Sequence, residues 1–194
     1  MSLRLAVLLS GSGRTLENLL ACIRAGTLPA EIGVVVSSRG DVRGVEIARA
    51  AGLPVHVLPP RDRPPAAWSA DIFDRCRAAA ADLVVLAGFL HLVEIPPDFA
   101  DRVINIHPSL LPAFGGRGFY GMHVHRAVLA AGATGSGCTV HLVDGEYDHG
   151  RILLQERVPV LADDTPESLA ARVFEAECRA LPEAIRRLAA GTLS

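Results

Sequence analysis

The residues best suited to chemistry lie in the segment Asn105-Ile106-His107-Pro108, which follows an apolar run and is stopped by proline. In an extended strand, residues two apart point to the same side, so Asn105 and His107 project together. An amide donor beside an imidazole can stabilise an oxyanion and move a proton. The pair lies at the carboxyl end of an expected strand, where open α/β sheets bind ligands. That position makes a catalytic role for His107 about as well supported as the alternative, in which His107 is only a hydrogen-bonded core residue.

A carboxylate beside His107 would orient its ring and stabilise the imidazolium cation. Three acids follow the next expected strand, which ends at Val143, and the residues alone do not choose among them: Asp144, Glu146 and Asp148. Solvated loop acids are an equally good interpretation of all three. His141 shares a strand face with Thr139 and Val143, and it either lines the site or packs there.

A glycine-rich turn, Ser10-Gly11-Ser12-Gly13-Arg14-Thr15, follows the first expected strand and opens the first helix. Glycines let the backbone turn sharply and approach a ligand, and a helix N-terminus offers free N–H groups to an anion. Ser12 and Thr15 add hydroxyl donors, and Arg14 adds positive charge. The turn matches neither the Walker A motif nor the complete dinucleotide-binding motif, so it favours a single phosphate over a nucleotide. The alternative is an ordinary strand-to-helix turn.

Glu177 is unusual because it falls on the apolar stripe of the expected terminal helix. A buried carboxylate requires a partner. Either a ligand amine or a salt bridge to Arg172 or Arg179 would supply one.

Neither a metal site nor a disulfide framework is expected. The four cysteines are widely spaced and form no CxxC pair. His123 and His125 form an HxH, but residues two apart do not share a helix face, and no third ligand is obvious.

Composition excludes several classes of protein. The 194 residues carry a formal net charge of −2 without a large basic cluster, so a nucleic-acid partner is not expected. No apolar run approaches the roughly 18 residues of a membrane span. The run Leu5 to Leu9 is too short for a signal peptide and reads as a strand, so a cytoplasmic protein is expected.

Apolar, β-branched runs alternate with helical patterns along the first half, which indicates βαβ units and a mostly parallel sheet. Expected strands span 5–9, 32–37, 55–58, 83–87, 102–107, 138–143 and 157–160. Expected helices span 15–25, 42–51, 66–80, 123–131 and a terminal segment that begins near Asp164 and is kinked or split by Pro182. We therefore expect one doubly wound, Rossmann-like α/β domain over residues 1–194.

With these residues in view, the chain resembles the formyltransferases that use 10-formyltetrahydrofolate, most closely those that act on phosphoribosylglycinamide in purine synthesis. Four segments carry the resemblance, which covers nearly the whole chain: Leu9 to Gly13, Val84 to Phe89, Asn105 to Pro112, and Gly137 to Gln155 with its Asp148-His149-Gly150. Two departures stand out. Leu90-His91-Leu92-Val93 replaces the Met-Arg-Ile-Leu of common members, and the loop Phe114 to Gly121 is longer than in the best-known ones.

The resemblance implies a phosphate- and acceptor-binding half, 1–100, and a catalytic and folate-binding half, 101–194. It also implies a role for each candidate residue. Asn105 and His107 would polarise the formyl carbonyl, and Asp148 would orient His107 or an ordered water. The segment Gly11, Ser12, Gly13, Arg14 and Thr15 would hold the substrate phosphate, and Glu177 the glycinamide end. The residues implied in folate binding are Leu90, His91, Leu92, Val93, His141, Leu142, Val143 and Asp144.

The resemblance also implies small-molecule substrates, phosphoribosylglycinamide and 10-formyltetrahydrofolate, with no metal, for a monomer or homodimer. Three alternatives remain: another formyl-folate-dependent formyltransferase, a formyltetrahydrofolate hydrolase, and a non-catalytic folate- or nucleotide-binding regulator. Intact Asn105, His107 and Asp148 argue against the regulator.

Overall fold

The computed structural model describes residues 2–60 and 63–192. The described strands follow the order β3-β2-β1-β4-β5-β6-β7 in one sheet, with five α-helices in the described residues. This mostly parallel arrangement confirms the predicted α/β class. By internal contacts the chain separates into two compact units, Met1–Ile104 and Asn105–Ser194, each described in turn. The assignment of roles to the two halves remains a prediction.

The first unit is built on four parallel strands. Its strands are β1 (Leu3–Leu9), β2 (Ala30–Ser37), β3 (Val55–Val57) and β4 (Leu83–Leu86). Strand β1 pairs with β2 and β4, and β3 pairs with β2. The helices are α1 (Arg14–Arg24), α2 (Arg43–Ala50) and α3 (Pro65–Ala78), followed by the short helix η1 (Pro97–Phe99).

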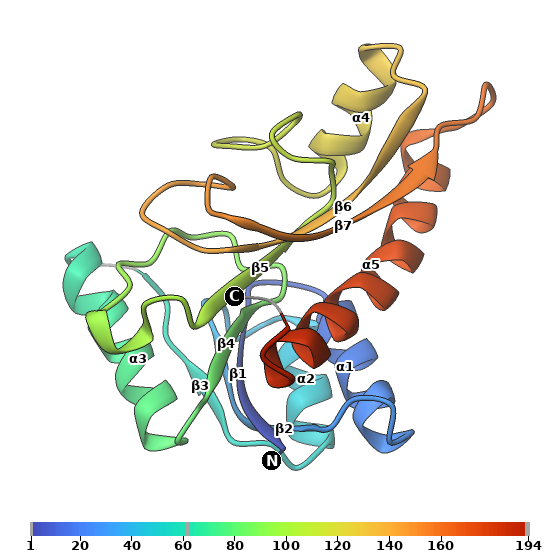
Figure 1. Ribbon diagram of the computed structural model, residues 1–194. Coiled ribbons are helices and arrows are strands. Elements are labelled where there is room, and N and C mark those ends of the chain that lie inside the picture. Colours follow the sequence, from blue (N-terminus) through green and yellow to red (C-terminus); the bar gives the residue numbers. More distant parts are fainter. Residues whose placement is uncertain (1, 61–62, 193–194) are drawn as a thin grey trace. The chain divides into compact units, whose positions relative to one another are not determined.

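The central strands of this unit are buried on both faces. Leu5, Ala6, Val7, Leu8 and Leu9 are all 0% exposed. Figure 1 shows the reason: α3 lies on one side of these strands, and α1 and α2 on the other. A strand covered on both faces has no solvent side, which explains the continuous apolar run.

The second unit begins at the end of β5 (Val103–His107) and contains a β-hairpin covered by a long helix. Helix α4 (Met122–Ala130) precedes β6 (Gly135–Leu142), which pairs antiparallel with β7 (Ile152–Pro159). The terminal helix α5 (Pro166–Ala189) runs along the hairpin (Figure 1). No described helix is long and apolar enough to cross a membrane.

Three features of β7 and α5 differ from the sequence prediction. Strand β7 begins at Ile152 rather than near Arg157, because the polar run Gln155-Glu156-Arg157 still pairs with β6. Helix α5 continues through Pro182 without a break, and Pro182 lies among the buried residues of its packed face. The capping residue is Thr165, whose side chain accepts from Ser168 N, rather than Asp164.

Candidate active site

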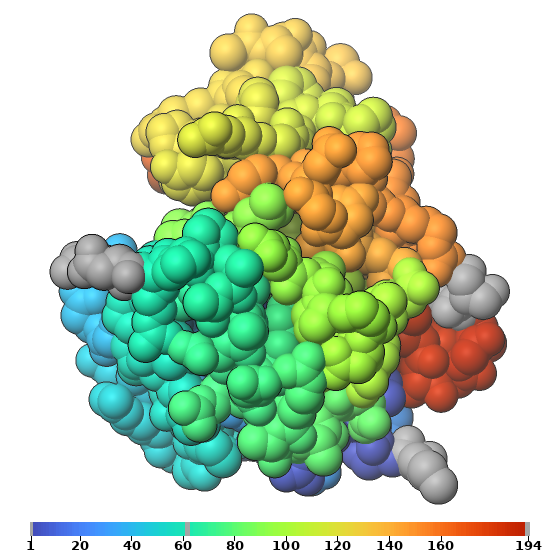
Figure 2. All heavy atoms as spheres, turned by 90° about the vertical axis from the view of Figure 1, so that its left-hand side faces the viewer, coloured from blue at the N-terminus to red at the C-terminus, as the bar shows by residue number. Residues whose placement is uncertain are grey.

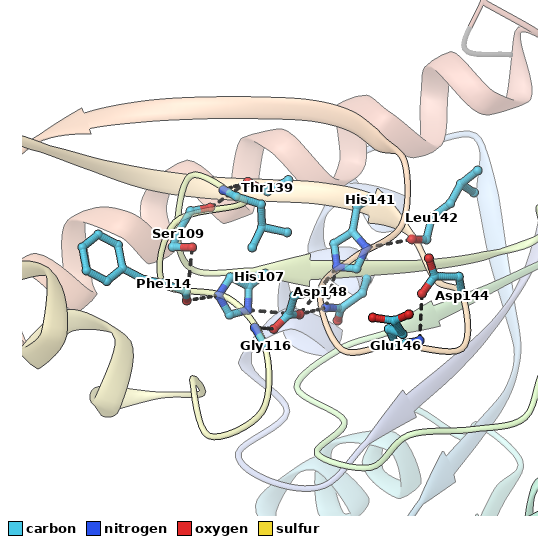
Figure 3. A network of polar contacts seen from close by, with 12 residues as sticks. His107, Ser109, Phe114, Gly116, Thr139, His141, Leu142, Asp144, Glu146 and Asp148 are labelled. Carbon is cyan, nitrogen blue, oxygen red and sulfur yellow. Dashed lines mark hydrogen bonds and ion pairs between the residues drawn. The ribbon is translucent and has the colours of Figure 1, made fainter.

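Strand β5 places Asn105 and His107 on one side, as their spacing predicts. His107 is 4% exposed, whereas Asn105 is half-buried. The two side chains meet Asp148, which lies in the turn between β6 and β7. Figure 3 shows Asp148 beside His107. Asn105 Nδ2 and His107 Nδ1 each lie 3.3 Å from the same atom, Asp148 Oδ1. The two donors therefore converge on a single oxygen.

Of the three candidate acids, Asp148 is the one beside His107. Asp144 instead holds His149, with 2.8 Å between Oδ2 and Nδ1, and its other oxygen accepts from Glu146 N. Glu146 is exposed. Asp148 has a positive φ of 53°, which turns its carboxylate back to the strand ends.

The Asp148 carboxylate is ionised by its surroundings. Burial by itself would raise the pKa of Asp148, but the hydrogen bond and charge of His107 and the Gly116 N–H outweigh it. They hold the pKa of Asp148 well below its usual range. Gly116 N donates to Asp148 Oδ2 at 3.0 Å, so both carboxylate oxygens have donors.

Both ring nitrogens of His107 face acceptors. Nδ1 faces Asp148 Oδ1, and Nε2 lies 2.8 Å from the carbonyl oxygen of Phe114. A neutral imidazole has only one N–H and can satisfy one of these acceptors, whereas the protonated ring can satisfy both. With the ring protonated, His107 and Asp148 form a charged pair.

His141 orients the Asn105 amide. His141 Nδ1 lies 2.7 Å from the Leu142 carbonyl oxygen, which requires a hydrogen on Nδ1. Nε2 then has its lone pair free to accept from Asn105 Nδ2 at 3.1 Å. This assignment directs both amide hydrogens of Asn105, one to His141 and one to Asp148.

A buried histidine on α4 lies near the pair. His125 is 5% exposed, and its Nδ1 has no hydrogen-bond partner among the described residues. Burial and, second, the charge of His107 lower the pKa of His125. The described residues contain no group of three or more His, Cys, Asp or Glu side chains arranged to hold a metal ion.

The glycine-rich turn lies in the first unit, between β1 and α1. Gly13 caps α1 with a positive φ of 71°, and no side chain caps this helix. A Cβ on Gly13 would come within 2.4 Å of Gly44 Cα, so only glycine permits this approach to α2. Ser12 and Arg14 are exposed beside the helix N-terminus, where an anion would be received.

Ser10 connects this turn to the segment Leu90–Val93, in a contact that sequence reasoning missed. Its hydroxyl accepts from Leu90 N at 3.1 Å and from Ser38 Oγ at 2.7 Å. In that segment Leu90 and Leu92 are exposed, while Val93 is buried. His91 packs edge-on against Trp68 and Phe89, and burial lowers its pKa.

The other predicted residues lie in the second unit. His141 and Leu142 are buried, and Val143 and Asp144 are half-buried. Glu177 is half-exposed on α5 and lies near Cys138 of β6. Burial, then the charges of Glu177 and Glu156, raise the pKa of the Cys138 thiol to about 12.

Comparison with known proteins identifies the family. The family model for formyl transferases matches residues 3–185. The chain belongs to the formyl transferase family. A curated relative, the chloroplastic phosphoribosylglycinamide formyltransferase of Vigna unguiculata, is 45% identical over 188 residues, which cover 95% of this chain and 60% of the relative. The chain thus spans less than two thirds of that relative's length.

Two solved structures extend the comparison to the fold. Glycinamide ribonucleotide transformylase 1 from Symbiobacterium toebii is 42% identical, with a TM-score of 0.89, over 98% of this chain and 89% of that one. The phosphoribosylglycinamide formyltransferase from Coxiella burnetii is 34% identical, with a TM-score of 0.90 and the same coverage. The family and its Rossmann-like fold are therefore as the sequence predicted.

Sequence reasoning missed the contacts made by the loop after β5. Neither Phe114 nor Gly116 was a candidate, because both contribute backbone atoms to the site. A backbone carbonyl and a backbone N–H have no residue signature. The only available signal was the Gly115-Gly116 pair, which indicates a tight approach without saying to what.

Proposed function

We propose that this protein transfers the formyl group of 10-formyltetrahydrofolate to the amine of phosphoribosylglycinamide. A formyl folate is the co-substrate expected of the family, and the compared structures carry the names of enzymes that formylate this amine. The geometry adds an observation independent of names. Two donors, Asn105 Nδ2 and His107 Nδ1, converge on one oxygen atom at 3.3 Å.

That convergence is what a formyl-transfer site requires. When an amine attacks the formyl carbon, negative charge develops on the formyl oxygen, and preorganised donors stabilise it. In the proposed reaction the formyl oxygen replaces Asp148 Oδ1 as the acceptor for Asn105. The other amide hydrogen of Asn105 stays on His141, which keeps the amide oriented.

The proton balance needs no metal and no covalent enzyme intermediate. The new C–N bond forms to the substrate amine, and the bond between the formyl carbon and the folate N10 breaks. The amine loses one proton, and N10 gains one. A protonated His107 can give its proton to N10 as the bond to N10 breaks, and the neutral ring can then take the proton that the amine loses, with Asp148 stabilising the charged form of the ring.

We also propose which residues bind the phosphate, the glycinamide end and the folate. The positive end of the α1 dipole and the glycine-rich turn before it support a phosphate site at Gly11, Ser12, Gly13, Arg14 and Thr15. Glu177 is proposed to hold the glycinamide end. The segments Leu90–Val93 and His141–Asp144 are proposed to hold the folate through backbone groups.

An assay with both substrates tests the proposal. Purified protein should form formylglycinamide ribonucleotide and release tetrahydrofolate in equal amounts. Release of formate without an added amine would identify a hydrolase instead. Turnover with a different amine would identify another formyltransferase, and binding of a folate analogue without any turnover would identify a regulator.

The cytoplasm remains the proposed compartment, and a monomer or homodimer the proposed state. Cell fractionation tests the compartment, and analytical ultracentrifugation measures the oligomeric state.

A further inference from the structure

The loop after β5 contacts the charged pair at both ends. Phe114 presents its carbonyl oxygen to His107 Nε2 at 2.8 Å. Two residues later, Gly116 presents its N–H to Asp148 Oδ2 at 3.0 Å. The loop therefore offers an acceptor to the cation and a donor to the anion, as Figure 3 shows.

The backbone of this loop leaves no room for a side chain at Gly115, between the two contacts. A Cβ on Gly115 would lie 2.4 Å from Leu111 Cδ2 and 3.3 Å from Asp148 Cβ. Gly116 has a φ of 91°, and even Phe114 has a positive φ of 55°. Positive φ values are costly for residues other than glycine, so contacts must hold this conformation.

A buried hydrogen-bond frame supplies those contacts. Thr139 donates to Ser109 O at 2.7 Å and accepts from Leu111 N at 3.1 Å. Gln155 Nε2 donates to Leu111 O and to Thr139 Oγ1, each at 2.9 Å. Both backbone groups of Leu111 are thus bound, and Leu111 is the residue against which Gly115 packs. The backbone of Leu111 therefore has little freedom to move away from Gly115.

We propose that Gly115 and Gly116 are positioning residues for formyl transfer, which hold the Phe114 carbonyl and the Gly116 amide against the two ends of the His107–Asp148 pair. This inference rests on the proposed function. A donor at the carboxylate favours its charged form, so the loop sets the alignment of the pair and helps to keep Asp148 ionised. Among the described residues, two other titratable groups lie near the pair: His141 on β6, 3.7 Å from Asp148 Oδ1, and His125 on α4.

The decisive variant is Gly115→Ala, because its methyl group meets Leu111 and Asp148. Gly118→Ala is the matched control. It lies in the same loop, has a φ of 95° and has nothing within 4 Å of an added Cβ, so it strains the loop without touching the pair. Loss of a hydrogen bond to a charged group should lower the kcat of Gly115→Ala by about tenfold or more, with little change in KM. Gly118→Ala should keep the parent kcat.

A readout without substrate separates this proposal from the proposed reaction. The side-chain carboxyl of Asp148, followed by NMR in the ligand-free protein, should titrate at a higher pH in Gly115→Ala, because the carboxylate loses a donor. Gly118→Ala should match the parent protein. This comparison stands even if no formyl acceptor is turned over.

Two outcomes overturn the proposal: equal effects of Gly115→Ala and Gly118→Ala, or a parent-like Asp148 titration and kcat in Gly115→Ala. If Gly115→Ala does not fold, Gly116→Ala takes its place. Its methyl group enters open space, but it strains the residue whose N–H binds Asp148. The Asp148 carboxyl of Gly116→Ala should then titrate at a higher pH than in the parent protein. An unchanged Asp148 titration in Gly116→Ala overturns the proposal.

Discussion

At the residue scale, the chemistry depends on where hydrogens are held. The Leu142 carbonyl fixes the tautomer of His141, His141 orients Asn105, and Asp148 and Phe114 each present an oxygen to one ring nitrogen of His107. Each link is a single short contact. Removal of one member should therefore affect turnover far more than stability.

His107→Ala should lower kcat by about 10²–10⁴, the usual contribution of a positioned acid–base group, while the protein stays folded. His123→Ala is the control, since His123 is an exposed histidine at the start of α4. Steady-state rates and circular dichroism measure the two effects. Turnover close to that of the parent protein would contradict the proposed mechanism.

At the element scale, the loops and turns that follow the strands bring the site together. The chain around residues 110–120 and the turn before β7 both reach the face of the molecule seen in Figure 2, in yellow-green and orange. Tyr120 and Tyr147, 49% and 41% exposed, lie in these two segments. The first segment is hydrogen-bonded to Thr139 and Gln155 of the hairpin β6–β7, and the second connects its two strands.

Helix α5 should lose stability when its cap is removed. Thr165 accepts from Ser168 N, and Ser168 Oγ accepts from Thr165 N, which forms a capping box. Thr165→Ala should lower the free energy of unfolding by about 1 kcal/mol. Thr165→Ser keeps the hydroxyl and serves as the control. Urea denaturation measures both variants, and an equal loss in the two would rule out the cap as the cause.

At the scale of the whole molecule, acid should destabilise the fold in two stages. His56, His91 and His125 have lowered pKa values, chiefly through burial, so their stabilising contribution is complete above about pH 6.5 and is lost below it. Asp148, Asp164, Asp98 and Glu183 also have lowered pKa values, and their contribution is lost as the pH falls below about 4. The exposed His149, whose pKa Asp144 raises, acts in the opposite sense.

Urea midpoints measured between pH 8 and pH 3 test this expectation. The midpoint should fall first between pH 7 and 5 and again below about pH 4. His125→Gln should reduce the first stage, because a neutral amide replaces the buried histidine. A midpoint that rises on acidification would contradict the sign of these shifts.

Local patterns were sufficient for most elements and for part of the site. The alternation of apolar runs and helical stretches predicted the α/β class, because burial on both faces leaves a continuous apolar strand. Asn105 and His107 were paired by the two-residue period of a strand, which is a property of neighbouring residues. The same local reasoning placed the start of β7 too late, because this edge strand carries polar residues. It also predicted a kink or break at Pro182, where α5 continues with Pro182 packed on its buried face.

The residue pattern by itself did not decide which acid lies beside the histidine; the resemblance implied Asp148, and the tertiary structure places it there. Asp144, Glu146 and Asp148 are equivalent by spacing, and the positive φ of Asp148 and the N–H of Gly116, 32 residues away along the chain, distinguish them. The acceptor for His107 Nε2 is likewise a backbone carbonyl, which no side-chain type reveals. The sequence by itself therefore determined the donors, because they share one strand. The structure alone revealed their backbone partners, the Phe114 carbonyl and the Gly116 N–H, because that loop reaches the pair only when the chain is folded.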